Sequence, residues 1–560
     1  MKIINLPFNE KLDDFIVKNG KGAFDVLITK AEEYDLSNKI KAEINSIRAI
    51  NMKSFERNKR ISEIVINRLK EKGKFLLTSI SPLYFSDETS RTYEFDDGRF
   101  IAFINDKFGI NASEVEWEYL SEQLRVEAVQ RGQKVEIKKV SYYDKENHKL
   151  YISNFNGGIY LLDGKIVQLV PNGADGVLFK DRENWEPYQY ETSHQRIRIF
   201  DHLLIHPINF HDAVLGGLTA KELRLLWKIY VYALFFEELM PSKPLVVFVG
   251  EHGAGKSTAL RSLLRFLFGP KVTVFSLSKK KEDAFLATIC NEHFVVLDNV
   301  DDRIDWLNDH LASIATGGGV PLRKLYTTNE ILTFSPRVYI TLTSRTPQFK
   351  REDVVDRMLL FPVERIKNFI ADSQIEDGIS KKRNLLWTEI INDLNSIVAS
   401  FEEHYEHKSS VNRIADFSQL GANLANWMKK PKTFQTIMNK LTLGHSSFML
   451  QDDPLFDLLE AWVGDRGNEG REVLAGDLHS DFQDVAMRKK VPYVYPSPRS
   501  LGRRLNNIIP SLRQFFDITI NDKGGNKRYY VFKNKRDIKL EGKELRKRLS
   551  KIKWPPKTAS

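Results

Sequence analysis

The residues best suited to chemistry lie in one stretch near the middle of the chain, PLVVFVGEHGAGKSTALRSLLRF, at residues 244–266. An apolar run at 245–249 predicts a buried strand, and leucines spaced by three and four after Lys256 predict an amphipathic helix. Between them, glycines let backbone N–H groups approach phosphate oxygens, and the helix N-terminus adds partial positive charge. The stretch therefore predicts a P-loop that binds a nucleotide, because strand, loop and helix follow in the required order.

The polar residues of this loop have separate expected tasks. The ammonium of Lys256 would lie beside the β- and γ-phosphates, and the hydroxyl of Ser257 would be a ligand of Mg²⁺. We expect ATP as the nucleotide. The residues expected to hold it are Gly250, Gly253, Gly255, Lys256, Ser257 and Thr258. A chance match to the pattern is the alternative, and the flanking strand and helix argue against it.

A second apolar run, in HFVVLDNVDD, ends at Asp298. Its carboxylate is expected to bind Mg²⁺ together with Ser257. Asn299 follows, where many such enzymes have a glutamate that activates water, and an amide cannot accept the proton of water. Asp301 and Asp302 are close enough in sequence to substitute, or they lie in a solvated loop. Nucleotide binding is therefore predicted more firmly than fast hydrolysis.

Further polar residues follow in TGGGVPLRKLY and VYITLTSRTPQFKREDVVDRMLLF. Arg323 and Lys324 come after a glycine-rich turn and could bind a phosphate backbone without sequence preference. Thr343 and Ser344, at the end of a predicted strand, could contact the γ-phosphate or the attacking water. A guanidinium such as that of Arg357 could act on the phosphate of a neighbouring subunit, the alternative being a surface ion pair. For Arg351 the ion pair is favoured.

These motifs together resemble the helicase region of the D5-type primase-helicases, in the superfamily 3 branch of AAA+ ATPases. The resemblance covers residues 73–370 and is carried by GEHGAGKST, VVLDNVD, TGGGVPLRKLY and LTSRTPQFKREDVVDRML. It implies a ring, usually a hexamer, that translocates on DNA with ATP bound between subunits. It also implies functional residues. These are Lys256, Ser257 and Asp298 for ATP and magnesium, Thr343 or Ser344 for sensing, Arg357 as a finger acting in trans, and Arg323 and Lys324 facing DNA.

The chain departs from this family at three points. Asn299 weakens the expectation of robust hydrolysis, and the sensing position lacks the asparagine that many relatives carry. Residues 1–190 contain no acidic metal constellation that would support primer synthesis.

The C-terminal region is basic and predicts a winged helix. SPRSLGRRLNNIIPSLRQFF begins with Ser497 and Pro498, which suit a helix start, and DITINDKGGNKRYYVF predicts a hairpin. The second helix of such a module enters the DNA major groove. The residues expected to contact DNA are Arg499, Arg503 and Arg504 on the helix and Lys527 and Arg528 on the wing. A winged helix that binds protein is the alternative.

Composition sets the wider frame. The formal net charge is +10, and the positive surplus lies after residue 470, which indicates a polyanionic partner held mainly by the tail. The one cysteine, Cys290, excludes an internal disulfide framework. No apolar run suits a membrane span and the start lacks the features of a signal peptide, so we expect a cytoplasmic protein.

The expected architecture is an α/β multi-domain chain. It has a P-loop, AAA+-like parallel sheet core, an N-terminal α+β region, a helical lid and a C-terminal winged helix. The expected parts are a helical segment (1–72), an α+β domain (73–195), a helical connector (196–243), the ATPase core (244–370), a helical region (371–470), the winged helix (471–535) and a basic tail (536–560).

Three functions remain open at this point. The leading hypothesis is an ATP-dependent DNA helicase or replication initiator of a phage or mobile element, assembled as a ring on DNA. The second is a nucleotide-switched DNA-binding or helicase-loader ATPase with slow hydrolysis, which Asn299 favours. The third is a signalling ATPase whose winged helix binds protein.

Overall fold

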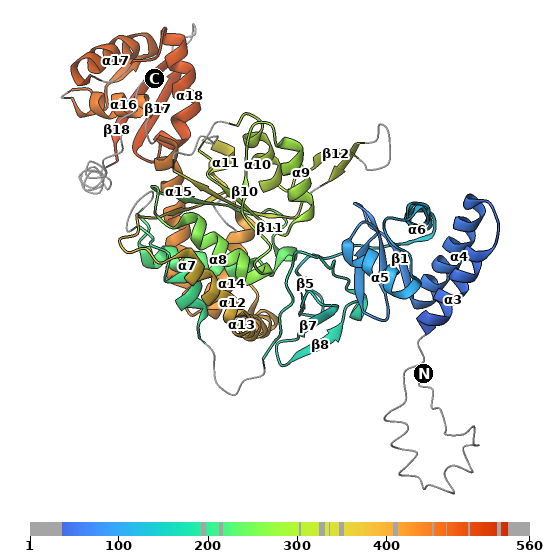
Figure 1. Cartoon of the computed structure of the whole chain (residues 1–560). Helices are drawn as coiled ribbons and strands as arrows, with labels where there is room; N and C mark the ends of the chain where they lie inside the picture. Colours follow the sequence, from blue (N-terminus) through green and yellow to red (C-terminus); the bar gives the residue numbers. More distant parts are fainter. Residues whose placement is uncertain are drawn as a thin grey trace, which may run out of the picture. The chain divides into compact units, whose positions relative to one another are not determined.

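The chain folds as a mixed α/β protein with several sheets. The computed structural model describes residues 36–191, 198–211, 217–301, 304–323, 331–334, 336–345, 352–406, 413–450, 453–465, 467–490, 493–522 and 528–535. These residues form two compact units (Figure 1). The first gathers the described part of Met1–Lys138 with Phe155–Gly158 and Pro171–Glu183, and the second gathers the described part of the remainder.

The first unit combines helices with a small sheet. Its elements are α3 (Leu36–Ala49), α4 (Ser54–Lys72), β1 (Gly73–Leu77), β2 (Pro82–Ser86), β3 (Arg91–Glu94), α5 (Gly98–Phe108), α6 (Val115–Arg131) and β4 (Gln133–Lys134), with the strands in the order β3-β2-β1-β4. Val65 and Leu69 of α4 share one core with Phe75 and Tyr84 of the sheet. The helices before residue 73 therefore pack with the strands that follow, which differs from the expected boundary between 72 and 73.

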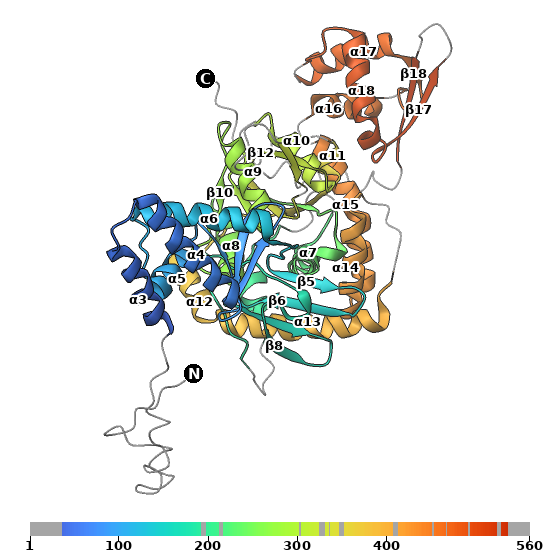
Figure 2. The same cartoon turned by 90° about the vertical axis from the view of Figure 1, so that its right-hand side faces the viewer.

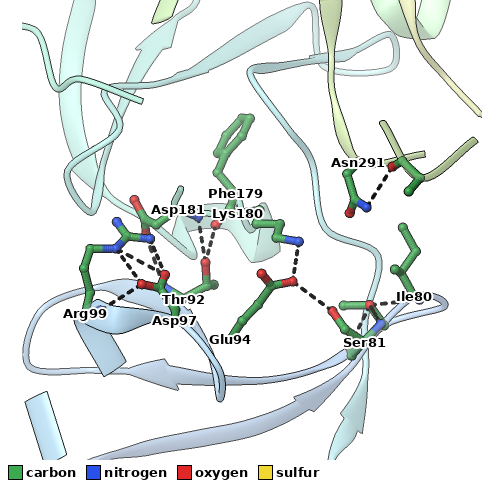
Figure 3. A network of polar contacts seen from close by, with 12 residues as sticks. Ile80, Ser81, Thr92, Glu94, Asp97, Arg99, Phe179, Lys180, Asp181 and Asn291 are labelled. Atoms are coloured by element: carbon green, nitrogen blue, oxygen red, sulfur yellow. Dashed lines mark hydrogen bonds and ion pairs between the residues drawn. The ribbon is translucent and has the colours of Figure 1, made fainter. Parts of the chain in front are cut away.

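Residues 171–183 complete the first unit from further along the chain. The hydroxyl of Thr92 on β3 donates to the carbonyl of Phe179 at 3.2 Å and accepts from the amide of Asp181 at 2.9 Å. The amide of Thr92 in turn donates to the carboxylate of Asp181 at 3.1 Å. Figure 3 shows these groups facing one another, with Lys180 turned toward Glu94. The expected single domain at 73–195 is thus divided, because residues 139–154 and 159–170 belong to the second unit.

Asp181 makes the stability of the first unit depend on pH. Burial raises the pKa of its carboxyl from 3.8 to about 6, against the amide of Thr92 and the charge of Arg99. The native state therefore binds this proton more tightly than the unfolded state does. We expect the free energy of unfolding of the first unit to fall as pH rises from about 4 to about 6, and to change little from this source above that range.

Hydrogen exchange of the core amides of α5 and β3, measured between about pH 4 and pH 8, checks this expectation. Asp181→Asn should remove the slope. The control Asp96→Asn, at a side chain that is 74% exposed, should keep it. A slope of the same size in Asp181→Asn would contradict the assignment.

The second unit begins with an antiparallel sheet of four strands. They are β5 (Ser141–Asp144), β6 (Lys149–Ser153), β7 (Gly158–Leu162) and β8 (Val167–Pro171), in that order across the sheet. After it, α7 (Ala220–Ala233) begins with a capping box in which Thr219 and Glu222 bond each other's backbone amides. This box satisfies N–H groups that the first helical turn leaves without partners.

A parallel sheet of five strands forms the centre of the second unit. Its strands are β9 (Leu245–Val249), β10 (Phe275–Ser276), β11 (Phe294–Asp298), β14 (Tyr339–Ser344) and β15 (Met358–Pro362), in the order β10-β11-β14-β9-β15. Every pairing is parallel. The inner strands β9, β11 and β14 are buried along almost their whole length, as expected where helices cover both faces. The helices between the strands are α8 (Lys256–Phe268), α9 (Glu282–Asn291), α10 (Leu307–Ala315) and α11 (Glu352–Val355).

A buried arginine donates hydrogen bonds to the C-terminal end of α8. Arg383 begins α13 (Arg383–His404), and its guanidinium donates to the carbonyls of Phe266 and Leu267 in the last turn of α8, at 2.9 and 3.1 Å. It also donates to the carbonyls of Glu186 and Pro187, at 2.8 and 2.9 Å. These bonds satisfy acceptors that a helix end leaves without partners, and they fix α8 from its C-terminal end.

Helices and a small sheet follow the parallel sheet. A two-stranded ladder, β12 (Val320–Arg323) and β13 (Ile331–Phe334), comes before β14 in the chain. The helices that follow β15, besides α13, are α12 (Asp372–Lys381), α14 (Ala415–Trp427), α15 (Pro431–Leu450), α16 (Pro454–Gly464), α17 (Ala475–Lys489) and α18 (Pro498–Leu512). The last strands are β16 (Glu472–Leu474), β17 (Phe516–Asp522) and β18 (Arg528–Asn534). Helices α14 and α15 lie side by side (Figure 2). Within the described ranges, no helix has the length and apolar character needed to cross a membrane.

The last elements share a core of their own. Leu459 and Trp462 of α16 pack with Phe482 of α17, Leu501 of α18 and Phe532 of β18. The small sheet has the order β16-β18-β17. Because α16 contributes to this core, the compact C-terminal group begins near residue 454 rather than at the expected boundary of 471.

Candidate nucleotide site

The glycine-rich loop, residues 250–255, joins β9 to α8 at the carboxyl edge of the parallel sheet. At Gly250 a Cβ atom would lie 2.2 Å from the carbonyl oxygen of Val363, so only glycine fits this close approach. Gly255 has φ of 74° and serves as N-cap of α8, a left-handed conformation that favours glycine. The loop thus turns sharply between a strand and a helix N-terminus, where backbone N–H groups and the helix dipole favour an anion.

Lys256 places a cation inside this loop. Its Nζ donates to the carbonyl oxygens of Gly250 and Glu251, at 2.6 and 3.0 Å. Burial lowers the pKa of Lys256, while the carboxylates of Asp301 and Asp298 act in the opposite direction. The ammonium therefore lies within the loop, bonded to two of its carbonyl oxygens.

Two hydroxyls from separate elements converge on one carboxylate oxygen. Oδ1 of Asp298, at the end of β11, accepts from the hydroxyl of Ser257 at 2.7 Å and from that of Thr343 at 2.5 Å. Thr343 lies at the end of β14, and its hydroxyl oxygen accepts from the amide of Asn299 at 3.0 Å. The two predicted metal ligands, Ser257 and Asp298, are thus in direct contact.

Ser344 and Asp301 form a second polar group at the same edge. The buried hydroxyl of Ser344 lies 2.8 Å from Oδ1 of Asp301 and 3.0 Å from the carbonyl oxygen of Val300. The amide of Arg345 also donates to Oδ1 of Asp301, at 2.5 Å. Ser344 is therefore engaged with Asp301, whereas the neighbouring Thr343 points to Asp298. Asp302 lies outside the described residues.

The segment after β15 packs against the loop and α8, which sequence reasoning missed. The amide of Ile366 donates to the carbonyl of Gly253 at 3.0 Å. Asp372, at the start of α12, accepts from the hydroxyl of Thr258 at 3.2 Å and pairs with Arg261 at 3.1 Å. Thr258, predicted to hold the nucleotide, thus has its hydroxyl turned to α12. No sequence motif marks Ile366 or Asp372. Their contacts with the loop and α8 arise because β15 pairs with β9, which brings the segment after β15 beside the loop.

Arg357 lies at the opposite edge of the sheet. Its carbonyl accepts from the amide of Leu245, the first residue of β9, at 2.9 Å. Lys256 and Asp298 follow the other ends of their strands, so Arg357 does not join them in its own chain. Within the described residues its Nη1 is buried and has no hydrogen-bond partner. Arg351 lies outside the described residues.

The predicted DNA-contacting residues differ in their surroundings. Arg499 and Arg503 are exposed on α18. Arg504, by contrast, forms an ion pair with Asp453, the N-cap of α16, whose side chain is only 4% exposed. Arg528 of β18 donates to Oδ1 of Asn506 at 3.2 Å. Lys527 and Lys324 lie outside the described residues, and Arg323 is described only as the end of β12.

Residues 222–440 match the family model described as "Actinomycete integrative conjugative element replication protein". The matched region runs from within α7 to within α15 and includes the glycine-rich loop and Asp298. The match relates this part of the chain to a replication protein of a mobile element. The narrower D5-type assignment stays a prediction.

Comparison with solved structures returns matches at low identity, some of them described as helicases. The apo C-terminal region of NrS-1 is 11% identical, with a TM-score of 0.39 over 83% of this chain and 98% of that chain. The SCCmec type IV Cch structure, described as an active helicase, is 14% identical, with a TM-score of 0.39 over 82% and 91% of the two chains. The JCV helicase is 13% identical, with a TM-score of 0.20 over 39% and 60%. Comparison with curated proteins returned no match.

Proposed function

We propose that the chain is an ATP-driven replication protein of a mobile element that acts on DNA as a helicase. One observation carries this proposal: Lys256, Ser257 and Asp298 meet at the carboxyl edge of the parallel sheet. The strand order supports it, because the loop follows β9, where successive strands pass from one side of the sheet to the other. Ligands of open parallel sheets bind at such a crossing point.

The residues at this edge suit ATP with Mg²⁺. The loop begins at Gly250, which packs too closely against the carbonyl of Val363 to carry a Cβ, and Lys256 supplies a cation within the loop. Ser257 and Asp298 are a hydroxyl and a carboxylate in contact, the hard oxygen donors that Mg²⁺ prefers. When bound, Mg²⁺ neutralises charge on the phosphate oxygens. Gly253, Gly255 and Thr258 would then present their backbone amides to the phosphates.

Arg357 is proposed to act on ATP bound to a neighbouring subunit. Its position before β15, at the edge opposite the loop, keeps it from the site of its own chain. Arg357 as a residue is part-exposed, although its Nη1 is buried within its own chain, so in a ring the residue would lie against the next subunit's phosphates.

The C-terminal group is proposed to be a winged helix that binds DNA. The order α16, β16, α17, α18, β17, β18 and the sheet order β16-β18-β17 support this assignment. Arg499 and Arg503 are proposed to enter a groove with α18, and Arg528 to touch the backbone beside it. Arg504 is proposed to stabilise the C-terminal group through its ion pair with Asp453 instead of contacting DNA. Arg323, at the end of β12, is proposed to meet DNA together with the next residue in sequence, Lys324.

Turnover of ATP by the purified chain, with and without single-stranded DNA, tests the enzyme, and strand separation on tailed duplexes tests the helicase. Turnover stimulated by DNA together with strand separation supports the proposal. Turnover without strand separation on either tail polarity rejects the helicase and leaves the second candidate.

The second candidate is a nucleotide-switched DNA-binding or loader ATPase with slow hydrolysis. Asn299 favours it, because an amide cannot accept the proton of the attacking water. DNA binding that requires ATP but not its hydrolysis would identify this function.

DNA affinity should depend on the exposed arginines of α18. We expect Arg499→Ala/Arg503→Ala to weaken duplex binding by about tenfold at moderate salt, because two cationic side chains at the DNA are lost. The slope of log affinity against log salt should become shallower by about 2. The matched control is Arg60→Ala on α4, an arginine that is 53% exposed and paired with Glu56. Fluorescence anisotropy with labelled duplex measures the affinity and its salt dependence for each variant. Unchanged affinity in the double variant would favour a winged helix that binds protein.

A further inference from the structure

The chain makes a one-residue bulge immediately after Asp298. In the register that pairs Leu297 with Leu342, the amide of Asn299 would donate to the carbonyl of Thr343. Instead the amide of Val300 does so, at 2.8 Å, and that of Asn299 donates to the hydroxyl of Thr343. Asn299 has φ of 55°, the left-handed conformation that asparagine tolerates better than glutamate. The bulge explains an asparagine at this position through backbone shape rather than chemistry.

The bulge returns the chain to β14 and brings Asp301 to the end of that strand. Oδ1 of Asp301 accepts from the hydroxyl of Ser344 and from the amide of Arg345. Ser344 is paired with Val249, the last residue before the glycine-rich loop, and its carbonyl accepts from the amide of Gly250 at 3.3 Å. The Asp301 carboxylate is therefore held at the carboxyl edge, one strand away from the loop.

Asp298 and Asp301 are two carboxylates at the carboxyl edge of the sheet, held by different partners. Asp298 is already engaged with the hydroxyls of Ser257 and Thr343, as expected for a metal ligand. Asp301 is the second carboxylate at this edge, and Ser344 and Arg345 orient it beside the strand that leads into the loop.

We propose that Asp301 is the general base of ATP hydrolysis in this chain, in place of the residue at 299. This assignment rests on the proposed ATPase function. Asp301 takes a proton from the attacking water while the water oxygen bonds to the γ-phosphorus. The bond from that phosphorus to the bridging oxygen breaks, and its electron pair stays on ADP. Lys256 balances the charge that develops on the phosphates. Ser344 and Arg345 are positioning residues, because they orient the carboxylate.

The test compares Asp301→Asn, Asp301→Glu and the control Asp305→Asn, an exposed aspartate of the same connection. Asparagine keeps the shape and can still accept from Arg345, but it cannot take a proton. We expect kcat of Asp301→Asn to fall by about 100-fold. Its affinity for ATP with Mg²⁺, by titration calorimetry, and its urea unfolding midpoint should stay near the wild-type values. Asp301→Glu should recover part of kcat, and Asp305→Asn should match the wild type.

The outcomes separate this assignment from the function on which it rests. Wild-type turnover that Asp301→Asn matches within about threefold would overturn the assignment alone. A loss of nucleotide affinity and unfolding midpoint as large as the loss of kcat would also overturn it, because it would identify a structural residue. A wild-type chain that turns over no ATP, with or without DNA, would overturn the proposed ATPase and this assignment together.

Discussion

Replacing Lys256 with alanine is expected to lower ATP turnover by at least about 1,000-fold. The ammonium is the cation that the structure holds within the glycine-rich loop, bonded to the carbonyls of Gly250 and Glu251. In the proposed site it would exchange these bonds for the β- and γ-phosphate oxygens, where charge grows as the phosphoryl group leaves. A neutral methyl group can make neither contact, so both binding and the chemical step should suffer.

The control for Lys256→Ala is Lys271→Ala, at an exposed lysine beyond the end of α8. Turnover and nucleotide affinity are measured for both variants, with urea unfolding to exclude a folding defect. The control should match the wild type. Lys256→Ala that keeps a tenth or more of the wild-type turnover would mean that the loop does not carry the catalytic phosphate contact.

Replacing Arg383 with methionine is expected to lower the free energy of unfolding by about 3–5 kcal/mol. Its guanidinium donates to carbonyls of Phe266 and Leu267 on one side and of Glu186 and Pro187 on the other. Burial lowers the pKa of Arg383 to about 10, so it remains charged at neutral pH. Methionine fills similar volume but leaves these buried acceptors without donors, apart from Phe266, which Trp387 also reaches.

Urea denaturation followed by tryptophan fluorescence measures the loss, and hydrogen exchange in α8 locates it. The control is Arg261→Met on α8, the helix whose C-terminal end Arg383 contacts. Arg261 is 39% exposed and pairs with Asp372 at the surface, so its loss should cost less than about 1 kcal/mol. An equal loss of free energy of unfolding in the two variants would show that the buried hydrogen bonds of Arg383 stabilise the chain no more than a surface ion pair does.

Local patterns predicted the strand, loop and helix around Lys256 well. The apolar run at 245–249 is β9, the leucine spacing marks α8, and Asp298 ends β11 as expected. These features depend on neighbours along the chain, so spacing and residue type are sufficient to find them. The predicted pair of Ser257 and Asp298 also meets, because both follow the carboxyl ends of strands in one parallel sheet.

Contacts between distant residues were not predictable in the same way. Asp453, the N-cap of α16, pairs with Arg504 of α18 and thereby occupies a predicted DNA contact from a different element. Asp372 meets Thr258 across more than a hundred residues. The position of Asp301 depends on a bulge of one residue after Asp298, which shifts the hydrogen bonding to β14 and leaves no periodic signal.

The first unit is assembled from three separate stretches of chain, and this has a practical consequence for dissecting the protein. A recombinant fragment that ends at Lys138 would lack Phe179 and Asp181, and Thr92 would lose its acceptors and its donor. Such a fragment should be poorly folded. A split version would need residues 171–183 supplied as a fused or added peptide, and recovery of a folded fragment on adding that peptide would make a complementation assay for the unit.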